Sequence, residues 1–113
     1  MAKKKKAVPA ASPVPTIYEA RLQPDGGVQK VREISLSDAV ALRQRGHEVV
    51  VCGGDLAANR SLAESIEQQA NGRWKRCPPH ASAGTNALPH YQPELRGPAG
   101  HTFYETPHRQ AVG

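Results

Sequence analysis

The sequence has few aromatic residues, two cysteines and no long hydrophobic run: five of its 113 residues are Phe, Trp or Tyr. A membrane-spanning helix needs about 20 consecutive apolar residues, and no stretch approaches that length. The lysine run at residues 3–6 is followed by alanine, proline and serine, which excludes a signal peptide with an apolar centre. Cys52 and Cys77 do not form a CxxC pair, so we expect reduced thiols, a cytoplasmic location and no membrane partner.

The length and composition fit one small domain with unstructured ends. Hydrophobic residues make up 38% and charged residues 22% of the chain, between the values of packed and disordered proteins. Residues 1–15 are rich in lysine, proline and alanine and predict a disordered basic arm. We therefore expect the arm at 1–15, a single domain at 16–106 and a frayed tail at 107–113.

The net charge of +5 is concentrated at the two ends of the chain. Four lysines lie in residues 1–6, so the rest carries 11 basic and 10 acidic side chains, a net charge of +1. Residues 72–113 carry five basic and two acidic side chains, a net charge of +3, together with four of the five histidines. This balance favours an anionic partner, with RNA expected first.

Periodicity and turn residues predict the order β-β-α-β-α-β-β. Alternating residues at 16–22 and 28–34 flank the turn-forming QPDGG and indicate a hairpin. A helix is expected after Ser35, which precedes Asp38 by three residues, and another after Asp55. The apolar run at 49–52 predicts a buried strand, and further strands are expected at 73–77 and near 100–106. The expected fold is a small α+β domain with a mixed, largely antiparallel sheet and two helices on one face.

The residue spacing favours two other kinds of site less. The strand–GG–helix stretch at 49–62 has the outline of a phosphate-binding turn, but it lacks GxGxxG and a P-loop lysine. The cysteines and histidines lack the close ligand pairs of structural zinc sites. We expect no metal and no cofactor.

Two histidines, one arginine and three aromatic rings fall within residues 89–105. Metal-free cleavage of RNA needs a base for the ribose 2′-hydroxyl, an acid for the departing 5′-oxygen and a cation for the phosphorane-like transition state. His90 and His101 lie on either side of Arg96 in the sequence, and His80 is a further candidate. We therefore predict that His90 and His101 share the acid and base roles and that Arg96 binds the phosphate.

Other basic and aromatic residues predict contacts with nucleic acid, because cations pair with phosphates and aromatic rings stack on bases. Phe103 could be a core residue instead, in which case alternation would turn Thr102 and Tyr104 outward. The predicted contact residues are Lys3, Lys4, Lys5, Lys6, Arg73, Trp74, Lys75, Arg76, Tyr91 and Tyr104.

The segments VVVCGGDLAANRSLAESIE, PHASAGTNALPHYQP and GHTFYE, between residues 49 and 105, resemble the closing segments of C-terminal effector domains from bacterial polymorphic toxin systems. In those domains a histidine- and proline-rich turn precedes a Gly-His-aromatic strand. The resemblance implies a small nuclease, commonly a ribonuclease on a compact α+β scaffold, and points to His90, His101 and then His80. This chain begins with its own methionine and has no delivery region, so secretion as a toxin is not expected.

The leading hypothesis from the sequence is a small RNA-directed protein that acts as a metal-independent endoribonuclease. Two alternatives stay open. One is a basic module that binds nucleic acid or a ribosome without cleaving it. The other is a structural subunit whose N-terminal arm inserts into a neighbouring protein of a larger assembly.

Overall fold

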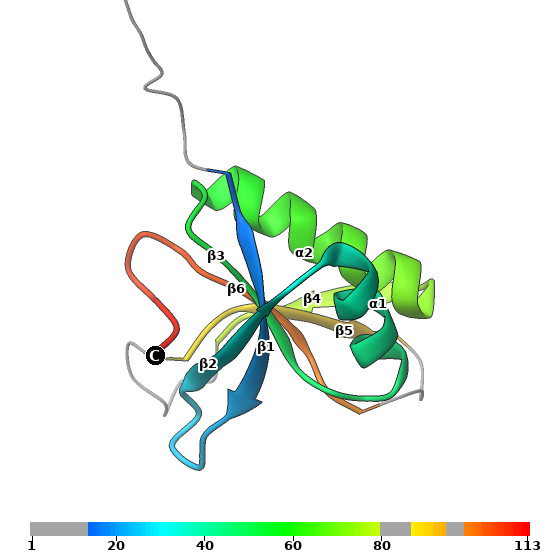
Figure 1. Ribbon diagram of the computed structural model, residues 1–113, viewed down its shortest axis with the longest axis horizontal. Coiled ribbons are helices and arrows are strands. Elements are labelled where there is room, and N and C mark those ends of the chain that lie inside the picture. Colours follow the sequence, from blue (N-terminus) through cyan, green and yellow to red (C-terminus); the bar gives the residue numbers. More distant parts are fainter. Residues whose placement is uncertain (1–13, 80–86, 95–98) are drawn as a thin grey trace, which may run out of the picture.

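The structure, a computed structural model, describes residues 14–79, 87–94 and 99–113, which form two helices and a six-stranded sheet (Figure 1). The predicted α+β class with a mixed, mostly antiparallel sheet is confirmed. The predicted basic arm lies, except for residues 14 and 15, outside the described residues. The elements are β1 (Thr16–Leu22), β2 (Val28–Ile34), α1 (Leu36–Gln44), β3 (Val49–Cys52), α2 (Leu56–Asn71), β4 (Trp74–Cys77), β5 (His90–Pro93) and β6 (Thr102–Tyr104).

The local signals in the first half of the chain form as expected. In the β1–β2 turn the Asp25 carboxylate accepts a hydrogen bond from the Gly27 amide at 2.8 Å. The Ser35 hydroxyl caps α1 by accepting from the Asp38 amide, and Asp55 caps α2 in the same way through the Ala58 amide. These short-range bonds begin and end the elements where the sequence predicts them.

The strand order β2-β1-β3-β6-β5-β4 places the last strand of the chain in the middle of the sheet. β6 runs parallel to β3, with Val49 opposite Thr102, and antiparallel to β5. All the other strand pairs are antiparallel. The residues just before β3 and just before β6 therefore lie at the same end of two adjacent strands.

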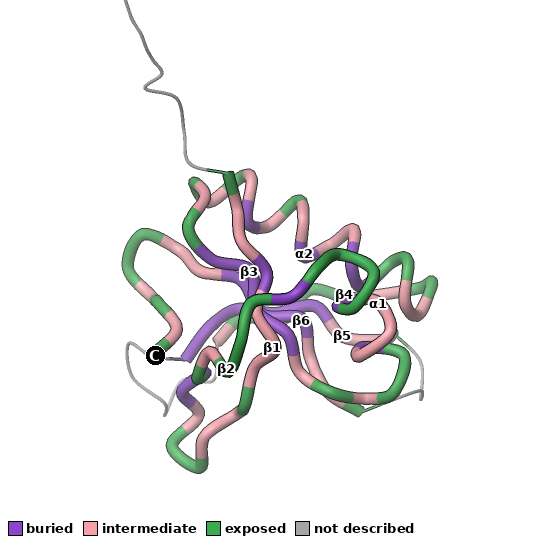
Figure 2. The backbone as a smooth tube through the Cα atoms, in the orientation of Figure 1, coloured by how far each residue is buried: buried purple, intermediate pink, exposed green. Residues whose placement is uncertain are grey.

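The two faces of the sheet carry different side chains. Both helices lie on one side (Figure 1), where Val49, Val51, Ile66 and Tyr104 belong to one apolar cluster. Val50 and Phe103 belong to a second cluster, which faces the other way because side chains alternate along a strand. Figure 2 shows the buried residues gathered where the strands cross at the centre. No helix among the described residues is long and apolar enough to cross a membrane.

Three expectations about the second half of the chain are wrong. The stretch between the fourth predicted strand and the final one contains β5, which the proline-rich composition concealed. Thr102 and Tyr104 do not face outward: they are buried at 0% and 4% exposure, because β6 is covered on both faces. The tail at 107–113 does not fray at its end, since Val112 exchanges backbone hydrogen bonds with β2.

Replacing Ile66, which is fully buried between α2 and the sheet, tests the position of the core. Ile66→Ala should lower the free energy of unfolding by about 2–5 kcal/mol, because it removes buried methyl groups and leaves a cavity. Leu36→Ala is the matched control, since Leu36 is 40% exposed. Urea denaturation measures both variants, and equal losses would contradict the assignment of the core.

Candidate active site around His101

The structure brings His90 and His101 together on the face of the sheet opposite the helices. His90 is opposite Phe103 in the β5–β6 register, and His101 directly precedes β6. The two imidazole centroids are 4.6 Å apart, with the rings at 73° to each other. Each ring also contacts Phe103, at 5.3 Å from His90 and 5.2 Å from His101. The predicted histidine pair is therefore one cluster.

The two histidines differ in their access to solvent. His90 is 2% exposed, and its Nδ1 lies 3.4 Å from the carbonyl oxygen of Leu88. The His101 side chain is 23% exposed. Of the pair, His101 is the imidazole that a solvent-borne molecule can touch, and His90 lies behind it.

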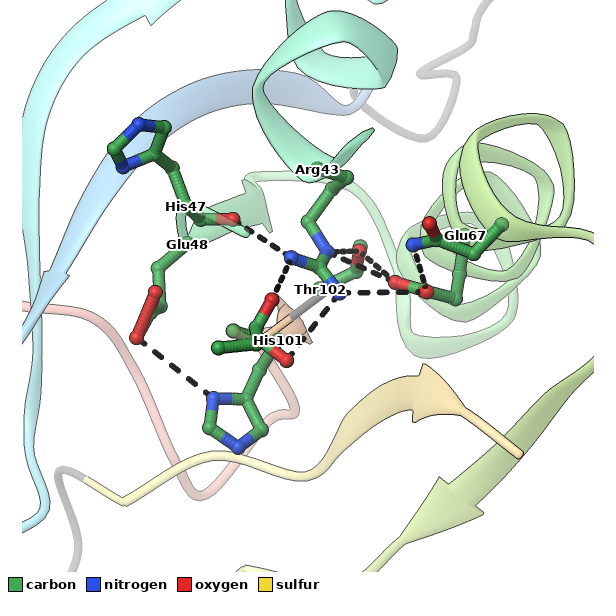
Figure 3. Close-up of polar contacts among 9 residues, drawn as sticks. Arg43, His47, Glu48, Glu67, His101 and Thr102 are labelled. Atoms are coloured by element: carbon green, nitrogen blue, oxygen red, sulfur yellow. Dashed lines mark hydrogen bonds and ion pairs between the residues drawn. The ribbon is translucent and has the colours of Figure 1, made fainter. Parts of the chain in front are cut away.

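The Glu48 carboxylate, which the sequence did not predict as a site residue, faces the Nδ1 atom of His101. The Glu48 Oε2 atom lies 3.8 Å from His101 Nδ1 (Figure 3). That nitrogen is buried, and among the described residues it has no hydrogen-bond partner. A shift of about 1 Å would bring the two atoms within hydrogen-bond range. A buried polar atom left in this state needs an explanation, and such atoms occur at catalytic sites.

Behind the histidines, on the helix side of the sheet, lies a fully buried ion pair. The Arg43 Nε atom of α1 donates to the Glu67 carboxylate of α2 at 2.9 Å, and both side chains are 0% exposed. Thr102 of β6 donates its hydroxyl to the same carboxylate at 2.9 Å. The sequence carried one signal for this pair: Arg43 and Glu67 are opposite charges on the apolar, inward faces of two predicted helices.

Two of the three aromatic residues predicted to stack on bases, Tyr91 and Tyr104, are core residues instead. Tyr91 and Tyr104 are 3% and 4% exposed, with ring centroids 5.6 Å apart. Burial raises the pKa of both phenols. Trp74 packs edge-on against Tyr91 at 5.3 Å. Tyr91 and Tyr104 therefore present no open face to a base, and the half-buried Trp74 packs against the same apolar cluster.

The predicted basic residues divide into two groups. Lys75 and Arg76 are exposed on β4, the edge strand, and Arg73 pairs with Glu94 at 3.2 Å on the surface. The others lie outside the described residues: Lys3, Lys4, Lys5, Lys6, His80 and Arg96.

The strand–GG–helix turn is satisfied by the protein itself. Glu105 accepts a hydrogen bond from the Gly53 amide at 3.2 Å, where a phosphate would otherwise bind. The Asn59 side chain bonds both the amide and the carbonyl of Gly54. Asp55 caps the helix. This geometry agrees with a structural turn.

A polar groove adjoins Glu48. Its volume is about 360 Å³, which falls within the range of small-molecule sites. Glu48 thus lines the groove and also faces His101. The lining residues are Glu19, Ala20, Arg21, Leu22, Val31, His47 and Glu48.

Comparisons of the chain with family models, with curated proteins and with solved structures found no match. The described residues contain no group of three or more His, Cys, Asp and Glu side chains placed to hold a metal ion.

Both cysteines are free thiols, and they differ in environment. Cys52 is buried, and desolvation together with the nearby Glu105 carboxylate raises its pKa to about 12. Because the folded-state pKa lies above the ordinary thiol value, the thiol stabilises the fold below about pH 9, and this contribution is lost as the pH rises toward 12.

Alkylation should distinguish the two thiols. At pH 8 the native Cys77→Ser variant, which retains Cys52, should react with iodoacetamide at least about 10-fold more slowly than the Cys52→Val variant, because the thiolate is the reacting species. Mass spectrometry follows the label, and unfolding in urea should equalise the rates. Equal rates in the native proteins would contradict the buried position of Cys52.

Proposed function

We propose that this protein is a metal-independent endoribonuclease in which His101 exchanges a proton with the RNA. One observation carries the proposal. A partly exposed imidazole stands between a carboxylate, 3.8 Å from its Nδ1, and a second imidazole, 4.6 Å from its ring centre. The proposal agrees with the resemblance of residues 49–105 to toxin nuclease domains.

The Glu48–His101 pair has the chemistry of an oriented acid–base catalyst. A carboxylate next to Nδ1 favours a proton on that nitrogen, which leaves Nε2 as the acceptor in the neutral ring. Glu48 would therefore orient the ring, while His101 contacts the substrate.

His90 limits the orientation of the His101 ring. The His90 ring packs edge-to-face against the His101 ring and also contacts Phe103, so the His101 ring cannot turn toward that side. Because His90 is buried, we assign the direct proton transfer to His101 and a positioning role to His90. This division refines the equal sharing of acid and base roles expected from the sequence.

The proposed reaction is an in-line transesterification. His101 Nε2 takes the proton of a ribose 2′-hydroxyl as that oxygen forms a bond to the adjacent phosphorus atom. The bond from phosphorus to the 5′-oxygen breaks, and water supplies the proton that this oxygen takes. His101 then returns its proton to solvent, so the products are a 2′,3′-cyclic phosphate and a 5′-hydroxyl. Arg96 keeps its proposed role as the cation beside the phosphate.

The groove next to Glu48 supports an extended substrate. Its lining includes Arg21 and His47, which can pair with backbone phosphates, as well as the carboxylates of Glu19 and Glu48. Its volume of about 360 Å³ is large enough for one nucleotide next to the cleaved bond.

Removing the His101 imidazole tests the proposal. His101→Ala should reduce cleavage of labelled RNA by about 100-fold or more, because general acid–base catalysis contributes about 10²–10⁴-fold. The control is His108→Ala, which removes an exposed histidine and should keep the parental rate. Circular dichroism checks that both variants fold.

The mechanism also constrains the substrate. Cleavage should continue in EDTA, and plasmid DNA should stay intact because it lacks the 2′-hydroxyl. Parental RNA cleavage by His101→Ala, or loss of cleavage in EDTA, would exclude the proposed chemistry.

A second candidate function is RNA binding without cleavage, which the exposed Lys75 and Arg76 of the edge strand favour. For this function, the double variant Lys75→Glu/Arg76→Glu should bind RNA more weakly and lower the slope of affinity against salt by about two. Arg45→Glu, at an exposed position, is the control. Fluorescence anisotropy measures the binding, and an unchanged salt slope would rule out this patch.

A further inference from the structure

Arg43 lies inside the protein, between the segment that carries Glu48 and the segment that carries His101 (Figure 3). Its Nη1 atom donates to the carbonyl oxygens of His47 and Ala99, each at 2.9 Å. Its Nη2 atom donates to the carbonyl of Gly100 at 3.3 Å, and its Nε atom donates to the hydroxyl of Thr102 at 3.1 Å. One guanidinium thus bonds the residue before Glu48 and the residues on both sides of His101.

The guanidinium is itself fixed from α2. The Glu67 carboxylate accepts from Arg43 Nε at 2.9 Å and from Nη2 at 3.3 Å. Asn71, one helical turn further along, donates to Glu67 at 2.6 Å. Asn71 thus fixes the Glu67 carboxylate, and Glu67 fixes the guanidinium. Residues of α2 therefore determine the directions in which Arg43 donates its hydrogen bonds.

The two segments also touch through their backbones. The Val49 amide donates to the His101 carbonyl at 3.2 Å. Gly46 and Gly100 have φ angles of +84° and +91°. A Cβ atom on Gly100 would lie 2.6 Å from Arg43 Nη1 and 2.7 Å from the carbonyl oxygen of Gly46. Glycine is needed there because the carbonyl groups and the guanidinium leave no room for a side chain.

A buried ion pair contributes less to stability than its contacts suggest, because both charges lose their hydration; apolar residues of similar volume often replace such a pair without loss. The value of this pair then lies in the geometry that it imposes. We propose that Arg43, held by Glu67, is a positioning residue that sets the distance between Glu48 and His101. This inference rests on the proposed function, and Arg43 acts through the backbone, without contacting RNA.

The first test is kinetic. Arg43→Lys keeps the charge, but one ammonium group cannot reach the carbonyl groups of both segments. With Glu48 and His101 misplaced relative to each other, kcat for RNA cleavage should fall about 10-fold or more, while KM stays within about twofold. Arg45→Lys, an exposed change at the end of the same helix, should leave both constants unchanged. Parental kcat in folded Arg43→Lys would overturn the inference.

The second test does not depend on cleavage. In the otherwise native protein, Glu48→Gln should shift the NMR signal of the His101 ring, because it removes a charge next to Nδ1. In the Arg43→Lys background the same change should have less than about half that effect, because the carboxylate and the ring no longer face each other. The signal of His108 serves as the reference. An undiminished effect would show that Arg43 does not set the distance.

The two tests separate the inference from the function on which it rests. If the parental protein leaves RNA intact but the NMR coupling is lost in Arg43→Lys, the ribonuclease proposal fails and the positioning role stands. Should Arg43→Lys not fold, the double variant Arg43→Met/Glu67→Met removes both charges together, which avoids leaving one unpaired. The same NMR comparison is then made in that background, after a thermal melt confirms folding.

Discussion

The buried ion pair between Arg43 and Glu67 joins both helices to the segments around Glu48 and His101, and the geometry of the candidate site depends on these bonds. Charges this far from water must be fully hydrogen-bonded, and the planar guanidinium has donors in fixed directions. The positions of the neighbouring carbonyl groups follow from those directions. The pair joins α1, α2 and the start of β6, and its bond to Thr102 links residues 59 positions apart in the sequence.

The parallel pairing of β3 and β6 determines which residues meet at the candidate site. Because the last strand enters the middle of the sheet, His101 arrives beside the segment that carries Glu48. Because side chains alternate along the chain, the adjacent residues His101 and Thr102 point to opposite faces of the sheet. Thr102 points to the helices and joins the buried ion pair, while His101 points to the opposite face and contacts His90. The buried ion pair and the candidate site therefore lie on opposite faces of the sheet.

The candidate site combines one accessible imidazole with groups that restrict it. His90 and Phe103 limit where the His101 ring can lie, and Glu48 faces its buried nitrogen. Such restriction reduces the entropy that a catalytic group loses when it meets its substrate. On the helix side of the same strands, Tyr91 and Tyr104 are buried because they belong to the apolar cluster packed under the helices.

The sequence by itself determined the elements whose signals are local. The β1–β2 hairpin depends on the turn at Asp25, and the helices begin at capping residues only three positions from the amides that they bind. The two-helix α+β class followed from these elements. The choice of His90 and His101 as candidate residues followed from the crowding of polar and aromatic residues in a short segment, although their contact with each other did not.

Only the tertiary structure decided where the second half of the chain goes. β5 has a proline-rich sequence with weak strand signals, and β6 is three residues long, so neither local pattern reveals its neighbours. Glu48 became part of the site through the pairing of β3 with β6. The physical reason is that local hydrogen bonds join residues a few positions apart. The pairing of distant strands depends instead on which apolar surfaces can be buried together and on where two charges can be satisfied in the interior.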